Sequence, residues 1–149
     1  MSTWSGIKNK LENEYLAESL RGHIQYFATV YRESHDQVGR AAIRYDGKEI
    51  LSGSWFSKDE QHDPNPLIVD DFKLNKGAFD EGDFYCAFHE FDNQSIEKSL
   101  QSEDLIVRIF AIFDKRVGKR RLLAMKNEIS NASEAFQLIY SIRVKAEGL

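Results

Sequence analysis

Asp46 and Gly47 separate two segments in which apolar and polar residues alternate, at residues 39–45 and 48–56. Alternation with a period of two is typical of strands that bury one face. An Asp-Gly pair favours the two positive φ angles of a type I′ turn, which joins antiparallel strands. Residues 23–32 are rich in β-branched and aromatic side chains and predict one more strand. The chain is therefore expected to contain a three-stranded antiparallel meander.

The segments before and after this meander in the sequence show the spacing of apolar residues that is typical of helices. Trp4, Ile7, Leu11 and Tyr15 recur at spacings of three and four, and Leu16 and Leu20 extend their stripe. We expect one amphipathic helix here, capped by Ser2 or Thr3 and closed by Gly22.

After residue 83 the pattern predicts only helices, and residues 105–113 are apolar apart from Arg108. An element that is apolar almost all round is expected at the buried centre of a helical layer. The expected N-caps are Asp92 or Asn93 for a helix over residues 95–100 and Ser102 for the apolar helix. Further helices are predicted around residues 122–125 and from about 132 to 148.

These elements predict an α+β fold with an N-terminal helix, a three-stranded antiparallel β-meander and a C-terminal layer of short helices. The length of 149 residues is typical of one domain. We expect a single domain over residues 1–149, in which residues 1–56 form the helix and meander and residues 83–149 form the helical layer. Residues 57–82 contain both prolines and predict a polar excursion between these parts.

The single cysteine, Cys86, has no partner for an intrachain disulfide, and it lies in a phenylalanine-rich segment where we expect it to pack as a small core residue. No apolar run approaches the roughly 18 residues of a membrane span, and no apolar signal core follows Met1. The sequence thus predicts a cytoplasmic protein without membrane contact.

Charge is unevenly distributed along the chain, although the net charge is only −4. Residues 57–92 hold ten acidic and three basic residues, whereas residues 105–127 hold seven basic residues and one acidic residue. The two regions can neutralise each other within the fold, or they can serve as separate binding surfaces. The acidic net charge argues against a nucleic-acid-binding protein, which is usually basic.

The sharpest local feature is a basic cluster of five cations within residues 115–121. Such a cluster can support the fold by pairing with carboxylates, or it can bind an anion or an acidic protein partner. We expect a division of roles among its members. Arg116 and Arg120 are expected to pair with neighbouring carboxylates, and Lys119 and Arg121 to be exposed. The cluster consists of Lys115, Arg116, Lys119, Arg120 and Arg121.

A second candidate site is a polar loop between the first two predicted strands. Ser34 and Asp36 favour a local turn there. Alternatively, Arg32, His35 and Arg40 could bind an anionic ligand at the end of the sheet.

Recognisable catalytic and metal-binding motifs are missing. Three histidines precede an acid, as His35-Asp36, His62-Asp63 and His89-Glu90, but none has the i, i+3 or i, i+4 spacing that places two ligands on one helical face. The sequence has no glycine-rich phosphate loop, dinucleotide fingerprint or nucleophile elbow. We therefore assign no catalytic residue, metal or cofactor.

Several stretches resemble a family of small uncharacterised bacterial proteins of unknown function. The resemblance implies a bacterial, cytoplasmic origin and lends no catalytic residue to this chain. The matching stretches are residues 4–8, 19–24, 31–36, 46–50, 95–100 and 114–122.

The leading functional hypothesis is a non-catalytic binding or interaction module, one form of which is an immunity-type protein that neutralises a toxin by surface complementarity. Its partner would be another protein. The alternative is a small-molecule-binding protein or an enzyme with a pocket between sheet and helices, lined at its polar end by Arg32, His35 and Arg40.

Overall fold

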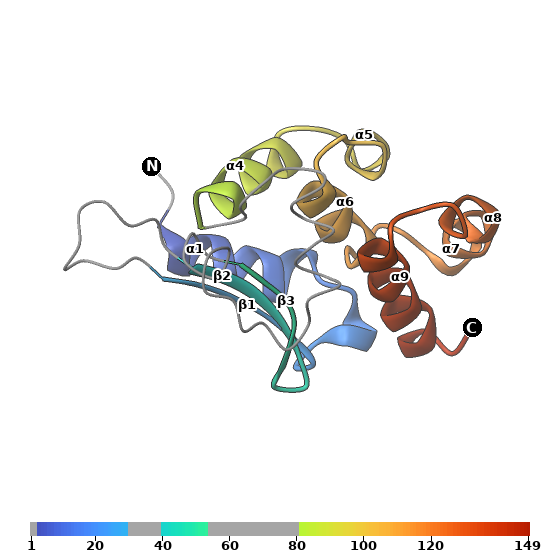
Figure 1. Ribbon diagram of the computed structural model, residues 1–149, viewed down its shortest axis with the longest axis horizontal. Coiled ribbons are helices and arrows are strands. Elements are labelled where there is room, and N and C mark those ends of the chain that lie inside the picture. Colours follow the sequence, from blue (N-terminus) through green and yellow to red (C-terminus); the bar gives the residue numbers. More distant parts are fainter. Residues whose placement is uncertain (1–2, 30–39, 54–80) are drawn as a thin grey trace.

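The computed structural model describes residues 3–29, 40–53 and 81–149. Within these ranges the chain forms an N-terminal helical segment, a three-stranded antiparallel sheet and a series of short helices (Figure 1). The predicted α+β architecture is confirmed. Most of the predicted polar excursion lies outside the described residues, and its last two residues already belong to a helix, α4.

The N-terminal segment begins with α1 (Trp4–Asn9), which continues directly into a π-helical stretch (Lys10–Tyr15). Thr3 caps α1 as predicted, because its Oγ1 accepts a hydrogen bond from the Gly6 amide at 3.2 Å. The predicted extent of this helix is wrong. Leu16 adopts an extended backbone, and a separate short 3₁₀ helix (Glu18–Leu20) follows.

Tertiary pairing ends this helix early. The amide of Ala17 donates to the carbonyl of Phe113 at 2.9 Å, and the amide of Lys115 donates to the carbonyl of Tyr15 at 2.7 Å. Leu16 and Leu20 are nevertheless buried, as their place in the apolar stripe predicted. The stripe therefore identified the core residues correctly, while their backbone conformation depends on a distant segment.

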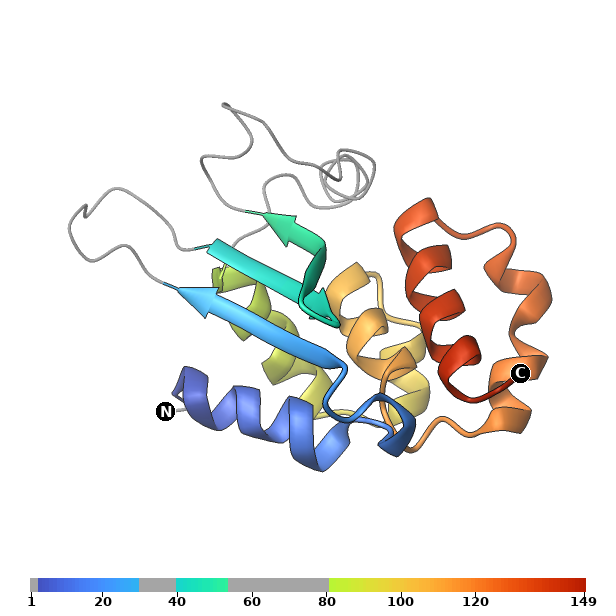
Figure 2. The ribbon, with the colours of Figure 1, turned by 90° about the horizontal axis from the view of Figure 1, so that it is seen from below.

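The sheet consists of β1 (Ile24–Thr29), β2 (Arg40–Tyr45) and β3 (Lys48–Gly53), ordered β1-β2-β3 with antiparallel pairing throughout. Asp46 and Gly47 have φ angles of 51° and 84°, which confirms the predicted turn between the last two strands. Helices α1 and α4 (Glu81–Asp92) pack on the sheet (Figure 2).

Helix α6 (Leu105–Ile112) is the centre of the helical layer and packs against α4, α5 (Ile96–Leu100) and α9 (Glu134–Ala146) (Figures 1 and 2). All of its residues except Arg108 are buried, as its apolar composition predicted. Its Phe110 ring contacts Tyr26 of β1 and Phe84 of α4 at centroid distances of 5.4 and 5.9 Å. This one side chain of α6 therefore contacts both the sheet and α4.

Two predicted N-caps are wrong, for local reasons. Helix α4 extends to Asp92, whose carboxylate binds Tyr15, and Ser95 instead caps α5 by accepting from the Lys98 amide at 3.2 Å. Asp104 caps α6, while the predicted cap Ser102 accepts a hydrogen bond from the Asp104 amide. Both corrections shift the cap to the residue immediately before the helix.

Cys86 is exposed, which corrects the expectation that it packs in the core. The buried face of α4 contains Phe84, Ala87, Phe88 and Phe91, at the spacings of three and four that place residues on one side of a helix. Cys86 lies two residues from Phe84 and two from Phe88, so it projects from another side.

The remaining helices are α7 (Lys119–Ala124) and α8 (Lys126–Ile129), which precede α9. No helix in the described part of the chain is both long and apolar enough to cross a membrane.

Truncation of Phe110 to alanine should destabilise the protein by about 3–5 kcal/mol, because it leaves a cavity between sheet and helices. The exposed Leu123 provides the control, and Leu123→Ala should change the free energy of unfolding by about 0.5 kcal/mol or less. Urea unfolding of both variants measures the difference. Equal effects would contradict the central position of Phe110.

Candidate functional site

The basic cluster begins in the connection between α6 and α7, with Lys115 and Arg116, and continues into the first three residues of α7. The backbone of the connection is fixed by the N-terminal segment. Leu16 and Asp114 form an isolated antiparallel bridge, which the two hydrogen bonds of Ala17 and Lys115 flank. The connection is therefore a well-defined part of the fold.

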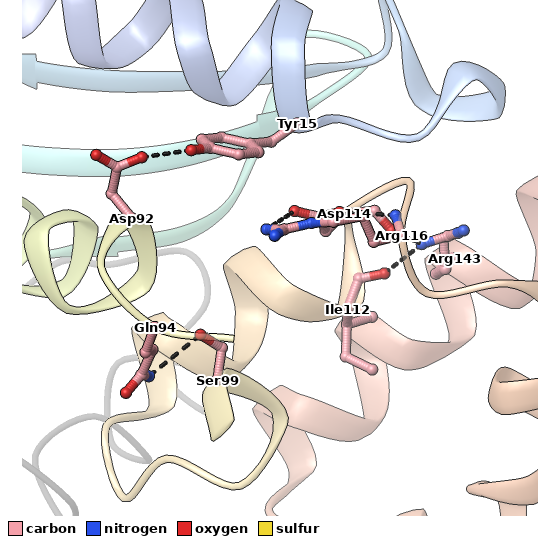
Figure 3. Close-up of polar contacts among 8 residues, drawn as sticks. All are labelled: Tyr15, Asp92, Gln94, Ser99, Ile112, Asp114, Arg116 and Arg143. Atoms are coloured by element: carbon pink, nitrogen blue, oxygen red, sulfur yellow. Dashed lines mark hydrogen bonds and ion pairs between the residues drawn. The ribbon is translucent and has the colours of Figure 1, made fainter. Parts of the chain in front are cut away.

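Arg143 of α9 binds this connection from the other side (Figure 3). Its guanidinium donates from Nη1 to the carbonyls of Ile112 and Asp114 at 2.6 and 2.9 Å, and from Nη2 to the carbonyl of Val117 at 2.7 Å. The last carbonyls of a helix lack intrahelical donors. Arg143, which is 2% exposed, supplies donors to the end of α6 and to the residues that follow it.

Asp114 and Arg116 form a bidentate ion pair within the connection (Figure 3). The Arg116 Nε and Nη2 atoms lie 3.0 and 2.8 Å from the two carboxylate oxygens, and the Arg116 amide donates to Oδ1 at 2.7 Å. Asp114 is fully buried. The expectation that Arg116 pairs with a carboxylate is confirmed, and the partner comes from the cluster's own segment.

Tyr15 and Asp92 extend this network to the N-terminal segment and α4 (Figure 3). The Tyr15 hydroxyl donates to Asp92, and the Arg116 guanidinium carbon lies 5.2 Å from the centroid of the Tyr15 ring. Burial, together with the bond to Asp92, raises the pKa of Tyr15 to about 12. A general base works best with a pKa near the operating pH, so this tyrosine is suited to joining elements and not to proton transfer.

At the α7 end of the cluster the cations are more exposed than Arg143 and less extensively paired than Arg116. Lys119 and Arg120 are exposed, and neither makes a hydrogen bond or ion pair with another described side chain, although the charge of Lys119 attracts the carboxylate of Glu147. Arg121 is half-buried, and its Nη2 lies 3.0 Å from Glu97 of α5. The predicted roles of Arg120 and Arg121 are therefore reversed.

Helical spacing explains this reversal. Arg121 is four residues before the buried Met125, whereas Arg120 is followed at three and four residues by the exposed Leu123 and Ala124. Arg121 thus faces the neighbouring helices, and Arg120 faces outward. The spacing was a usable signal in the sequence.

Lys119, Arg120 and Leu123 form what we call the outer face of α7. Its two cations lie in the first turn of the helix, where the helix dipole disfavours positive charge, and the N-cap Gly118 offers no side-chain acceptor. Leu123 has 55% of its surface exposed. Apart from the attraction of Lys119 to Glu147, the polar contacts of the described residues do not involve the charged ends of Lys119 and Arg120.

The other predicted ligand site lies mainly outside the described residues. Arg32 and His35 fall there, and Arg40 is described only as the first residue of β2, paired with Thr29. In the part of the chain that the structure describes, no three metal-ligating side chains lie together.

Two hollows occur among the described helices. A wide polar groove of about 530 Å³ includes Glu90, Glu103 and Asp104 in its lining. A smaller cavity of about 170 Å³ lies among α5 to α9, and Arg108 and Arg121 line it. Sequence reasoning missed this cavity, although Arg108 is the one charged residue in the apolar segment 105–113.

Glu147 couples this network to pH. Burial alone would raise the pKa of Glu147, but hydrogen bonds from Ser19 and Arg143 hold it below its usual value. A depressed carboxylate pKa contributes stability above the unfolded-state pKa, and this contribution is lost as pH falls through the folded-state pKa. Folding should therefore weaken on acidification.

We expect Glu147→Gln to lower the free energy of unfolding at pH 7 by on the order of 1 kcal/mol, and to differ little from the unsubstituted protein once Glu147 is protonated in acid. Urea titrations at pH 7 and in acid measure this change. Glu14→Gln, at an exposed position, is the control. A Glu147→Gln deficit that is independent of pH would contradict the assignment.

Comparison with known proteins gives a family. No curated protein and no solved structure matches the chain. The model of one uncharacterised family matches residues 3–144, a range that includes α1, the sheet, the basic cluster and nearly all of α9. The chain belongs to the SF0329 protein family.

Proposed function

We propose that this chain is a non-catalytic interaction protein that binds an acidic protein partner through the outer face of α7. The bacterial and cytoplasmic setting is part of the same proposal. It rests on the sequence resemblance and on the single cysteine. An immunity-type protein, which covers a partner's surface, is one form of such a module.

The charge of the outer face is the observation that carries the proposal. Lys119 and Arg120 are exposed cations on a protein of net charge −4, and their position in the first turn of α7 opposes the helix dipole. A positive patch of this kind accelerates encounter with an acidic surface and disfavours wrong partners.

Leu123 adds an apolar contact to these cations. Protein interfaces typically combine an apolar centre with a polar rim. Leu123 is one of two exposed large apolar side chains in the described residues, and it follows Lys119 and Arg120 by four and three positions on the helix. The three side chains therefore lie on neighbouring positions of one helical surface.

The described histidines support a non-catalytic role. His23 hydrogen-bonds to Asp46 at the hairpin turn at 2.7 Å, and His89 is exposed near the end of α4. Neither is joined to a serine or cysteine in the described part of the chain. A nucleophile activated by a neighbouring base requires such a pair.

Affinity capture from an extract of the source organism tests the proposal with a matched pair of variants. The face variant carries Arg120→Glu and Leu123→Gln. The control carries Lys48→Glu and Leu149→Gln, which alter an exposed cation and the other exposed leucine. We expect one partner protein to be retained by the unsubstituted chain and the control, and lost by the face variant. Retention should fall as salt rises, because exposed charges are screened.

Stability provides an independent check on the same variants. Arg120→Glu places an acid in the first turn of α7, so it should stabilise the protein by about 0.3–1 kcal/mol. A face variant that loses its partner and also unfolds more easily would assign the outer face to folding. Equal capture by the face variant and the control would contradict the proposal.

A further inference from the structure

The cavity among α5 to α9 combines apolar walls with two cations. Met125, Ile129 and Phe136 contribute to its walls, and Arg108 and Arg121 reach it from α6 and α7. Its volume is about 170 Å³. An apolar cavity of roughly 150 Å³ is large enough to bind benzene, so a ligand with a single ring or a short branched chain would fit here.

Arg121 is only partly satisfied. Its Nη2 pairs with Glu97 near the surface, at 3.0 Å, and Glu97 is 61% exposed. Its Nε is buried and has no hydrogen-bond acceptor in the described part of the chain. Because a buried N–H donor is normally paired, the guanidinium of Arg121 retains hydrogen-bonding capacity that the described residues do not use.

Arg108 supplies the second cation. Its guanidinium carbon lies 5.3 Å from the centroid of the Phe136 ring, which holds the charge against an apolar wall. Glu128 is the one carboxylate that lines the cavity, so the lining carries two positive charges and one negative charge. Glu97, which pairs with Arg121 near the surface, is largely exposed and screened by water, so the excess of positive charge at the cavity is small and favours a monoanion over a dianion.

We propose that this cavity binds a free small monocarboxylate with an aromatic or short branched apolar body. The carboxylate accepts hydrogen bonds from Arg121, assisted by the charge of Arg108, and the apolar body packs against Met125, Ile129 and Phe136. Arginine is suited to this role because its planar fork matches a carboxylate. The site goes beyond the proposed interaction function and uses none of the side chains of the outer face of α7.

The test uses 4-fluorobenzoate as the probe, with binding followed by ¹⁹F NMR on the full chain. Its amide, 4-fluorobenzamide, has the same ring without the charge. We expect the carboxylate to bind and the amide to bind at least about tenfold more weakly, since a hydrogen bond to a charged group contributes that much affinity or more. Equal binding of the two compounds, or no binding of the carboxylate at millimolar concentration, would overturn the proposal.

Two arginines next to each other on α7 provide a matched pair of variants. Arg121→Met keeps the apolar stem and removes the cavity charge, whereas Arg120→Met removes a charge from the outer face. The first should weaken 4-fluorobenzoate binding about tenfold or more, and the second should leave it within about twofold. An equal loss of affinity in both variants would show that only the net charge of the protein matters, and it would overturn the proposed site.

Ala132→Leu keeps both arginines and fills the cavity, which Ala132 lines, so it tests the site even if Arg121→Met fails to fold. It should abolish binding of 4-fluorobenzoate, and undiminished binding would place the ligand elsewhere.

A short peptide that ends in phenylalanine tests the second possible source of a carboxylate, which is the C-terminus of another protein. Tighter binding of the peptide than of 4-fluorobenzoate would overturn the assignment to a free acid.

Discussion

The buried guanidinium of Arg143 is the contact on which the arrangement of the helical layer depends. It binds the carbonyls of Ile112, Asp114 and Val117, and its Nε donates to Glu147, which in turn accepts from Ser19. A charged group without partners is very unfavourable in a protein interior. Here four acceptors surround it, namely three carbonyls at and after the end of α6 and the carboxylate of Glu147. Ser19 is joined to the guanidinium through Glu147, so the positions of these three segments constrain one another.

This arrangement explains why the five cations of the basic cluster differ in their environment. Arg116 lies where the connection is fixed between α9 and the N-terminal segment, and it neutralises the buried Asp114. Lys119 and Arg120 lie beyond that point, on a helix whose own dipole opposes them. Arg121, next to them, turns inward to Glu97 and the cavity. The structural and exposed parts of the cluster are thus separated by only a few residues.

Local patterns predicted much of the fold. The Asp46-Gly47 turn, the alternation in the strands and the apolar character of α6 each depend on neighbouring residues, and each was predicted correctly. The end of the first helix was not, because a backbone bridge to Asp114, almost a hundred residues away in sequence, determines it. Long-range hydrogen bonds of this kind leave no periodic signal in a single sequence.

The candidate site was less predictable for the same reason, but two signals were present. Arg143 follows Ile139 by four residues and therefore lies on the apolar stripe of α9, where a charged residue must be buried or paired. Arg121 precedes the buried Met125 by the same interval. Helical spacing could have assigned both arginines to the interior, whereas their partners, backbone carbonyls and Glu97, become visible only in the fold.

The free energy of unfolding of Arg143→Met, compared with that of Lys145→Met, tests the central role of the buried guanidinium. Both substitutions remove one cation from α9, but Lys145 is exposed. Loss of Arg143 removes one donor from Glu147 and from each of three carbonyls in the interior, so it should cost about 3–5 kcal/mol. Loss of Lys145 should cost about 0.5 kcal/mol or less. Similar values for the two variants would contradict the account.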